Sequence, residues 1–159
     1  MATYIKHLED VYNVLVRFKI EDPVIRTAAF LHDAIEDGAA SYGKIERKFG
    51  KDVAELAYAV TDELGRNRRE RHAKTFPKIK NDMRALILKL ADRIANIEYG
   101  RSKNAVNSLF DMYKKEYRTF KKELNGNPSD FSQLQEVDGL KEKLQQMWFY
   151  LDSLFSYKP

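Results

Sequence analysis

The chain has 159 residues, of which 43% are hydrophobic and 33% charged, the size and composition of a single globular domain. It has no cysteine, so disulfides and thiolate metal sites are excluded, and any bound metal must be held by histidine and carboxylate ligands. The small net charge of +4 suits an anionic small molecule as well as a nucleic acid. With only 7 glycines and 4 prolines, turn formers are too few for a many-stranded β fold. We therefore expect one all-α helical domain over residues 1–159.

The sequence shows neither a secretion signal nor a membrane span. The first residues lack an apolar core segment, and no apolar run approaches the roughly 20 residues that a bilayer requires. We therefore expect a cytoplasmic protein that does not contact membranes.

Apolar residues at helical spacing divide the chain into predicted helices. These helices cover residues 4–18, 23–37, 41–50, 52–62, 82–98, 104–124 and 133–155. Residues 65–80 are polar and strongly basic, which predicts a loop with at most a helical turn. Asn and Gly residues and a proline predict a corner at 125–130. The last helix is rich in Leu, Met, Trp and Phe, and we expect it to pack across the body of the domain.

Residues 28–38 combine one histidine and three carboxylates with an apolar helix face. At about 100° per residue, four polar residues of the predicted helix fall within an arc of roughly 140°: His32, Asp33, Glu36 and Asp37. Adjacent carboxylates repel one another and are costly to desolvate beside a core, and a divalent cation removes both penalties. An acidic, solvated helix face is the structural alternative, but the full set of four residues favours a metal site.

A second polar group interrupts the otherwise apolar segment 85–97. Its members lie within about 100° of one another on a helical wheel: Lys89, Asp92, Arg93 and Asn96. An internal ion pair between Asp92 and one of the two cations would explain them, because buried charges need partners. Taken together with His32 and Asp33, Asp92 is the better candidate for a third metal ligand.

His7 is the candidate for a fourth ligand. It lies beside the apolar stripe of the first predicted helix, and the other remaining histidine, His72, falls in the basic segment. A packed or exposed histidine without a metal is the alternative. Two histidines and two aspartates, with no sulfur, suit Mn²⁺, Fe²⁺ or Co²⁺ as well as zinc.

These residues resemble those of a known family. His7, His32-Asp33 and Asp92 match the H…HD…D motif of HD-domain metal-dependent phosphohydrolases. The segments Leu31-His32-Asp33-Ala34-Ile35-Glu36-Asp37 and Lys89-Leu90-Ala91-Asp92-Arg93-Ile94-Ala95-Asn96 resemble the hydrolase domain of RelA/SpoT enzymes, in particular the small alarmone hydrolases of the metazoan SpoT-homologue type. The resemblance covers roughly residues 3–123, and the paired HD-x-x-E-D and K-L-A-D-R-x-x-N motifs are specific.

The resemblance implies an HD-type helical hydrolase that removes pyrophosphate from the 3′ position of guanosine tetra- or pentaphosphate, usually with Mn²⁺. His7, His32, Asp33 and Asp92 would be the metal ligands. Glu36 and Asp37 would position and activate the attacking water. Asn96 would contact the ribose of the substrate, beside Lys89 and Arg93.

Two departures from the family concern the base of the substrate. The family's helix before the first histidine, which ends in an Arg-x-Lys-Gly type segment that cradles the base, has no counterpart ahead of His7, and Leu8 replaces the usual proline. We therefore expect relaxed base selectivity, with Tyr99, Tyr113 or Tyr117 available for stacking. The basic segment could hold the second diphosphate of the substrate as a group: Arg66, Arg68, Arg69 and Lys74.

Two other functions stay open at this point. One is an HD-type phosphohydrolase of other nucleotides, such as nucleoside or deoxynucleoside phosphates or NADPH. The other is a basic helical module that binds nucleic acid without catalysis. The second is disfavoured because the acidic residues converge with histidine and the basic segment lacks interleaved aromatic residues for base stacking. The oligomeric state is not predicted.

Overall fold

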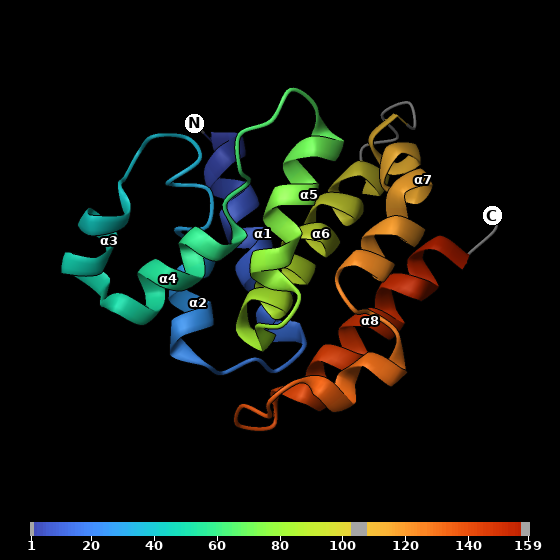
Figure 1. Ribbon diagram of the computed structural model, residues 1–159. Coiled ribbons are helices and arrows are strands. Elements are labelled where there is room, and N and C mark those ends of the chain that lie inside the picture. The colour runs from blue at the N-terminus through green and yellow to red at the C-terminus, as the bar shows by residue number, and fades with distance from the viewer. Residues whose placement is uncertain (1, 103–107, 157–159) are drawn as a thin grey trace.

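The computed structural model describes residues 2–102 and 108–156, and within these ranges every regular element is helical (Figure 1), which confirms the all-α prediction. The elements are α1 (Ala2–Arg17), α2 (Pro23–Ala29), α3 (Tyr42–Phe49), α4 (Lys51–Val60), α5 (Arg68–Ile79), α6 (Met83–Ser102), α7 (Ser108–Glu123), a 3₁₀ helix η1 (Pro128–Gln133) and α8 (Leu140–Ser156). No helix in the described part of the chain combines the length and apolar character needed to cross a membrane.

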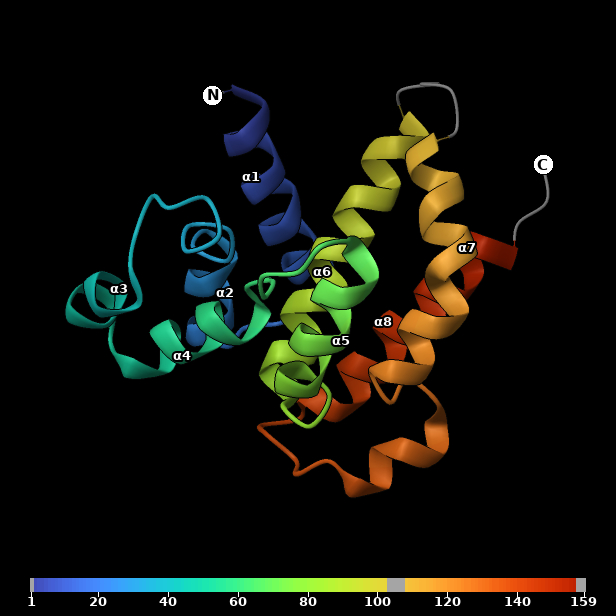
Figure 2. The ribbon, with the colours of Figure 1, turned by 45° about the horizontal axis from the view of Figure 1, so that its top comes forward.

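Helix α6 is the centre of the fold. It packs against α1, α2, α4, α5, α7 and α8, and both ribbon views place it between α1 and α2 on one side and α7 and α8 on the other (Figures 1 and 2). It is apolar on nearly all sides, as a helix surrounded by other helices must be, with most of residues 83–97 buried. The polar residues that interrupt this surface are those singled out in the sequence, so they lie inside the fold.

The N-terminal half is fixed by side-chain caps. Asp22 Oδ1 accepts hydrogen bonds from the backbone N–H groups of Val24 and Ile25 at 2.9 and 3.1 Å, and its Oδ2 accepts from Arg84 Nε of α6 at 2.7 Å. This carboxylate therefore starts α2 and also ties it to the central helix. Gly50 adopts a φ of +92° between α3 and α4, a conformation that side chains with a Cβ rarely adopt.

The helix predicted over 23–37 ends eight residues early. Beyond Ala29 the backbone bonds shift to i→i−3, from Leu31 N–H to Ala28 O and from Ala34 N–H to Leu31 O. The Ala29 carbonyl, which a continuing helix would offer to Asp33 N–H, instead accepts a bond from His32 Nδ1 at 2.8 Å. The polar cluster therefore lies on a series of tight turns.

The loop predicted over 65–80 is wrong, because most of it forms α5. Asn67 caps this helix by accepting a hydrogen bond from Glu70 N–H at 2.9 Å, and the Glu70 carboxylate accepts one from Arg66 N–H. Its buried side includes two polar side chains, His72 and Thr75, so its apolar periodicity is weak in the sequence.

In the C-terminal third, part of the predicted helix 104–124 lies outside the described residues, and α7 covers the rest. The predicted corner is present, with η1 inside it, and the last helix starts at Leu140 instead of 133. Helix α8 packs on α6, as expected. At the corner, a Cβ on Gly126 would lie 2.9 Å from the Trp148 ring, so only glycine allows this close approach.

Candidate active site

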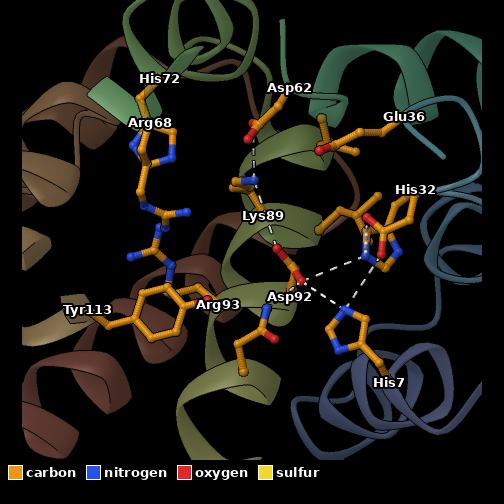
Figure 3. Close-up of a pocket in the computed structure, with 14 residues that line it drawn as sticks. His7, His32, Glu36, Asp62, Arg68, His72, Lys89, Asp92, Arg93 and Tyr113 are labelled. Atoms are coloured by element: carbon orange, nitrogen blue, oxygen red, sulfur yellow. Dashed lines mark hydrogen bonds and ion pairs between the residues drawn. The ribbon is translucent and has the colours of Figure 1, made fainter. Parts of the chain in front are cut away.

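A cavity of about 290 Å³ opens at the polar interruption of α6 (Figure 3). Five helices and the turns after α2 supply its lining. The lining residues are His7, His32, Asp33, Glu36, Val60, Asp62, Arg68, His72, Leu88, Lys89, Asp92, Arg93, Asn96 and Tyr113. Segments distant in the sequence thus bring most of the predicted site residues into one space.

Two histidines and two aspartates converge on one side of this cavity. The Nε2 atom of His7 lies 3.1 Å from Asp92 Oδ1 and 3.8 Å from Asp33 Oδ2. The Nε2 atom of His32 lies 3.2 Å from Asp33 Oδ1 and 3.7 Å from Asp92 Oδ1. One ligand atom from each of His7, His32 and Asp33 falls within a common 4.8 Å. Asp92 is not part of this three-residue group, but its Oδ1 lies next to both imidazoles, so the four predicted ligands are close together.

The His32 imidazole is held with one nitrogen facing this cluster. Its Nδ1 must donate to the Ala29 carbonyl, which leaves the lone pair of the neutral ring on Nε2. The exposed fraction of His32 is 4%, and its Nε2 is buried without a hydrogen-bond partner among the described residues. Burial opposes the charged form of His32, but the carboxylates of Asp92 and Asp33 outweigh it and raise the pKa of this imidazole. Without a metal, a proton on Nε2 answers these carboxylates, and a divalent cation bound to Nε2 can do the same. The cluster thus fits a divalent metal held by nitrogen and oxygen ligands.

The two aspartates differ in their electrostatics. Burial opposes ionisation of Asp92, but the imidazoles of His32 and His7 and the Lys89 ammonium hold its pKa well below the usual value. Burial raises the pKa of Asp33, and repulsion from Asp92 adds to this, against the attraction of the two imidazoles. Two carboxylates in one half-buried cluster favour a bound cation, because it stabilises both ionised forms.

Glu36 lines the cavity from a more exposed position, next to Asp62. Burial, with repulsion from Asp62, raises the pKa of Glu36. Lys89 lies between the carboxylates of Asp62 and Asp92, with its Nζ 3.8 Å from both Asp62 Oδ1 and Asp92 Oδ2. Asp37 is exposed, interacts with the Tyr4 hydroxyl and is not among the residues lining the cavity.

Cationic side chains line the opposite side of the cavity (Figure 3). Arg68 and Arg93 both bond to the carboxylate of Glu116, and the Arg93 guanidinium lies 4.4 Å from the Tyr113 ring centroid. Burial and the Arg68 charge lower the pKa of His72 to about 4, so this imidazole is neutral at pH 7. Acidic and cationic groups are therefore segregated on the two sides.

Asn96 sits between these two sides on α6, and its Nδ2 donates to Asp92 Oδ1 at 2.9 Å. Three of the predicted phosphate-binding cations lie elsewhere, because one precedes α5 and the other two lie on its exposed side. Arg66, Arg69 and Lys74 are exposed, and none is among the lining residues. Arg66 and Lys74 both pair with Glu70.

Sequence reasoning missed three residues in or beside this site. Asp62 follows the end of α4, His72 lies on a helix that was not predicted, and Glu116 was one of many charges on α7. A usable signal existed only for α5: Asn67 and Glu70 have the spacing of a capping box. Asp62 and Glu116 belong to the site because they pair with Lys89 and Arg93 of α6, contacts that the sequence does not reveal.

The sequence matches the family described as HD domain over residues 1–114. The chain belongs to the HD-domain family. The matched range contains all four predicted ligands, including the adjacent pair His32-Asp33 on the turns after α2.

Two curated relatives of this HD domain carry named activities. The guanosine-3′,5′-bis(diphosphate) 3′-pyrophosphohydrolase MESH1 of Drosophila melanogaster is 36% identical over 96 residues, which cover 59% of this chain and 54% of that protein. The bifunctional (p)ppGpp synthase/hydrolase SpoT of Escherichia coli K12 is 40% identical over 101 residues, 59% of this chain and 14% of that protein. The match thus spans about half of the fly protein and a small part of SpoT.

Solved structures share the arrangement of helices. A metazoan ortholog of SpoT, described as hydrolysing ppGpp, superposes with a TM-score of 0.67 at 28% identity, over 95% of this chain and 82% of that one. The protein lmo0812 of Listeria monocytogenes EGD-e superposes with a TM-score of 0.62 at 23% identity, over 94% of this chain and 95% of that one, and shares the fold alone.

Proposed function

We propose that this HD domain is a metal-dependent hydrolase that removes pyrophosphate from the 3′ position of guanosine 3′,5′-bis(diphosphate)-type alarmones. The observation that carries the proposal is the cluster of His7, His32, Asp33 and Asp92, in which Nε2 of His32 is buried. Across the cavity this cluster faces Arg68 and Arg93, which we call the cationic wall. The named activities of the fly and bacterial relatives support the same chemistry. A nucleotide substrate and a cysteine-free chain favour a cytoplasmic setting.

The four clustered residues would hold the metal, and we propose Mn²⁺ because nitrogen and oxygen ligands without sulfur suit it. When bound, this ion lowers the pKa of a coordinated water and neutralises phosphate charge. His32 would bind through Nε2, since its Nδ1 is committed to the Ala29 carbonyl. Asn96 holds Asp92 by donating to Oδ1, which fixes the orientation of this carboxylate.

Glu36 is the proposed general base. Its side chain reaches the cavity beside the ligand cluster, and its raised pKa makes it a better proton acceptor than a solvated glutamate. Asp37, which is exposed, would support this role through Asp33, whose pKa it raises. Glu36 would therefore accept the proton of the attacking water, and Asp37 would act only indirectly, through its charge.

The remaining lining residues would bind the substrate. Lys89 stands between the acidic groups and can neutralise the departing pyrophosphate, while Arg68 and Arg93 offer charge-assisted hydrogen bonds to phosphate. The amide oxygen of Asn96 can accept from a ribose hydroxyl, because its Nδ2 is already used. Tyr113 is the tyrosine of the cavity lining and the candidate for contact with the base.

Phosphorus NMR of the reaction products tests this proposal. Purified protein is stripped of metal, reconstituted with Mn²⁺ and incubated with guanosine 3′,5′-bis(diphosphate). We expect equal amounts of pyrophosphate and guanosine 5′-diphosphate, and no reaction with chelator. Release of orthophosphate, or cleavage at the 5′ position, contradicts the proposed reaction.

A further inference from the structure

Glu116 joins the two arginines of the cationic wall, although it is not itself among the residues that line the cavity. It lies on α7, and its carboxylate accepts three hydrogen bonds. Arg68 donates from Nε to Oε2 at 2.9 Å and from Nη2 to Oε1 at 2.8 Å, and Arg93 donates from Nη1 to Oε1 at 2.6 Å. One carboxylate on α7 thus fixes side chains from α5 and α6.

The Arg93 guanidinium is held on its other sides by aromatic rings. It is 3% exposed and lies 4.4 Å from the ring centroid of Tyr113 and 4.0 Å from that of Phe120. A buried cation is stable only with a well-placed partner, and Glu116 is that partner. The orientation of Arg93 therefore depends on this carboxylate.

The wall keeps donors and positive charge after these bonds are made. In the described part of the chain no hydrogen bond engages Nη1 of Arg68, or Nε and Nη2 of Arg93. One carboxylate against two guanidinium groups leaves a net charge of +1. The pair can thus receive a second anionic group at a fixed place.

Figure 3 shows this wall across the cavity from His7, His32 and Glu36, with Lys89 and Asp92 between the two sides. A substrate with phosphate at both ends could span the two sides. We propose that Glu116 is a positioning residue, which orients Arg68 and Arg93 to bind the diphosphate remote from the bond that is cleaved. The inference rests on the proposed function and adds that this carboxylate selects substrates carrying phosphate on both the 3′ and 5′ positions.

The test compares two substrates in three proteins. Guanosine 3′,5′-bis(diphosphate) reaches both sides, whereas guanosine 3′-diphosphate lacks the remote group. For Glu116→Gln we expect a KM for the first substrate about 10-fold above wild type, as expected for the loss of a charge-assisted hydrogen bond, with little change in kcat. Its KM for the second substrate should stay at the wild-type value. Glu123→Gln, an exposed position on the same helix, is the control and should match wild type.

The direction of the change is decisive. If Glu116 only neutralised charge, its replacement would raise the positive charge of the wall and lower the KM for the bis(diphosphate), which overturns the inference. An unchanged KM, or an equal rise for both substrates, overturns it as well. Should Glu116→Gln fail to fold, Glu116→Asp keeps the charge that Arg93 needs but shortens the reach, and the same substrate-selective rise in KM is expected.

A binding measurement separates this inference from the proposed reaction. Inorganic pyrophosphate is titrated calorimetrically into the chelator-treated proteins, where the acidic side repels anions and the cationic wall is the attractive surface. We expect a Kd about 10-fold weaker for Glu116→Gln than for wild type and Glu123→Gln. If wild type hydrolyses neither nucleotide, the proposed function fails while this titration still judges the inference. Equal Kd values, or no binding to wild type, overturn it.

Discussion

Replacement of Glu36 by glutamine separates the chemistry of this site from its metal binding. The two side chains have the same shape, and Glu36 is outside the four-residue ligand cluster, so metal content should not change. The side chain lines the cavity beside Asp62, within reach of the space where substrate and water would lie. Loss of a general base typically costs about 10²–10⁴-fold in rate, or roughly 2.7–5.4 kcal/mol of transition-state stabilisation.

The pKa of Glu36 determines the direction in which kcat changes with pH. Burial and the neighbouring Asp62 raise the pKa of Glu36 above its ordinary value, and a base works only when ionised. At saturating metal, kcat should therefore rise with pH through this raised pKa. Asp62→Asn removes the repulsion, so the acid limb should move to lower pH.

The assay is kcat between pH 4 and 9 (a range of about five units that begins near the ordinary glutamate pKa and extends above it), with metal content measured in parallel. Glu46→Gln, at an exposed position of α3, is the control and should behave as wild type. A Glu36→Gln protein that retains its metal and turns over substrate as fast as wild type would show that another group is the base.

Three further predictions concern the metal, the fold and the base. Asp33→Ala and Asp92→Ala should each lose the metal and the activity while far-ultraviolet circular dichroism stays near wild type; full metal occupancy in either variant would falsify the ligand assignment. Asp22→Ala should lower the free energy of unfolding by about 2 kcal/mol, because this carboxylate caps α2 and accepts from Arg84, and urea denaturation should show it with metal content unchanged. The adenosine analogue of the substrate should be cleaved at a comparable rate, because the proposed base contact is stacking on Tyr113, which does not distinguish one purine from the other; a hundredfold preference for guanosine in kcat/KM contradicts this.

The sequence predicted the parts of this protein that depend on local pattern. The apolar surface of α6 and its polar interruption follow from a single segment, and the helix predicted over 41–50 matches α3 within one residue at each end. Convergence of His7, His32, Asp33 and Asp92 was predicted from residue chemistry together with the family resemblance, and the structure places these four side chains next to one another.

Other parts depend on side-chain hydrogen bonds and long-range contacts, which the spacing of apolar residues does not reveal. The apolar spacing of Ala28, Leu31 and Ile35 predicts a continuous helix, but the bond from His32 Nδ1 occupies a carbonyl which that helix would need. Helix α5 was missed because its buried face includes His72 and Thr75, polar residues that a hydrophobic pattern ignores. Glu116 could not be singled out at all, because its importance comes from two arginines that are 48 and 23 residues away in the sequence.

The central claim is that this cavity hydrolyses the 3′-pyrophosphate of a bis(diphosphate) nucleotide. The most direct measurement is kcat/KM with Mn²⁺ for guanosine 3′,5′-bis(diphosphate), determined beside nucleoside triphosphates, deoxynucleoside triphosphates and NADPH under the same conditions. The account predicts that the bis(diphosphate) is the preferred substrate, by about 100-fold or more if the remote diphosphate contributes two charge-assisted hydrogen bonds. A preference for triphosphates or for NADPH would contradict it.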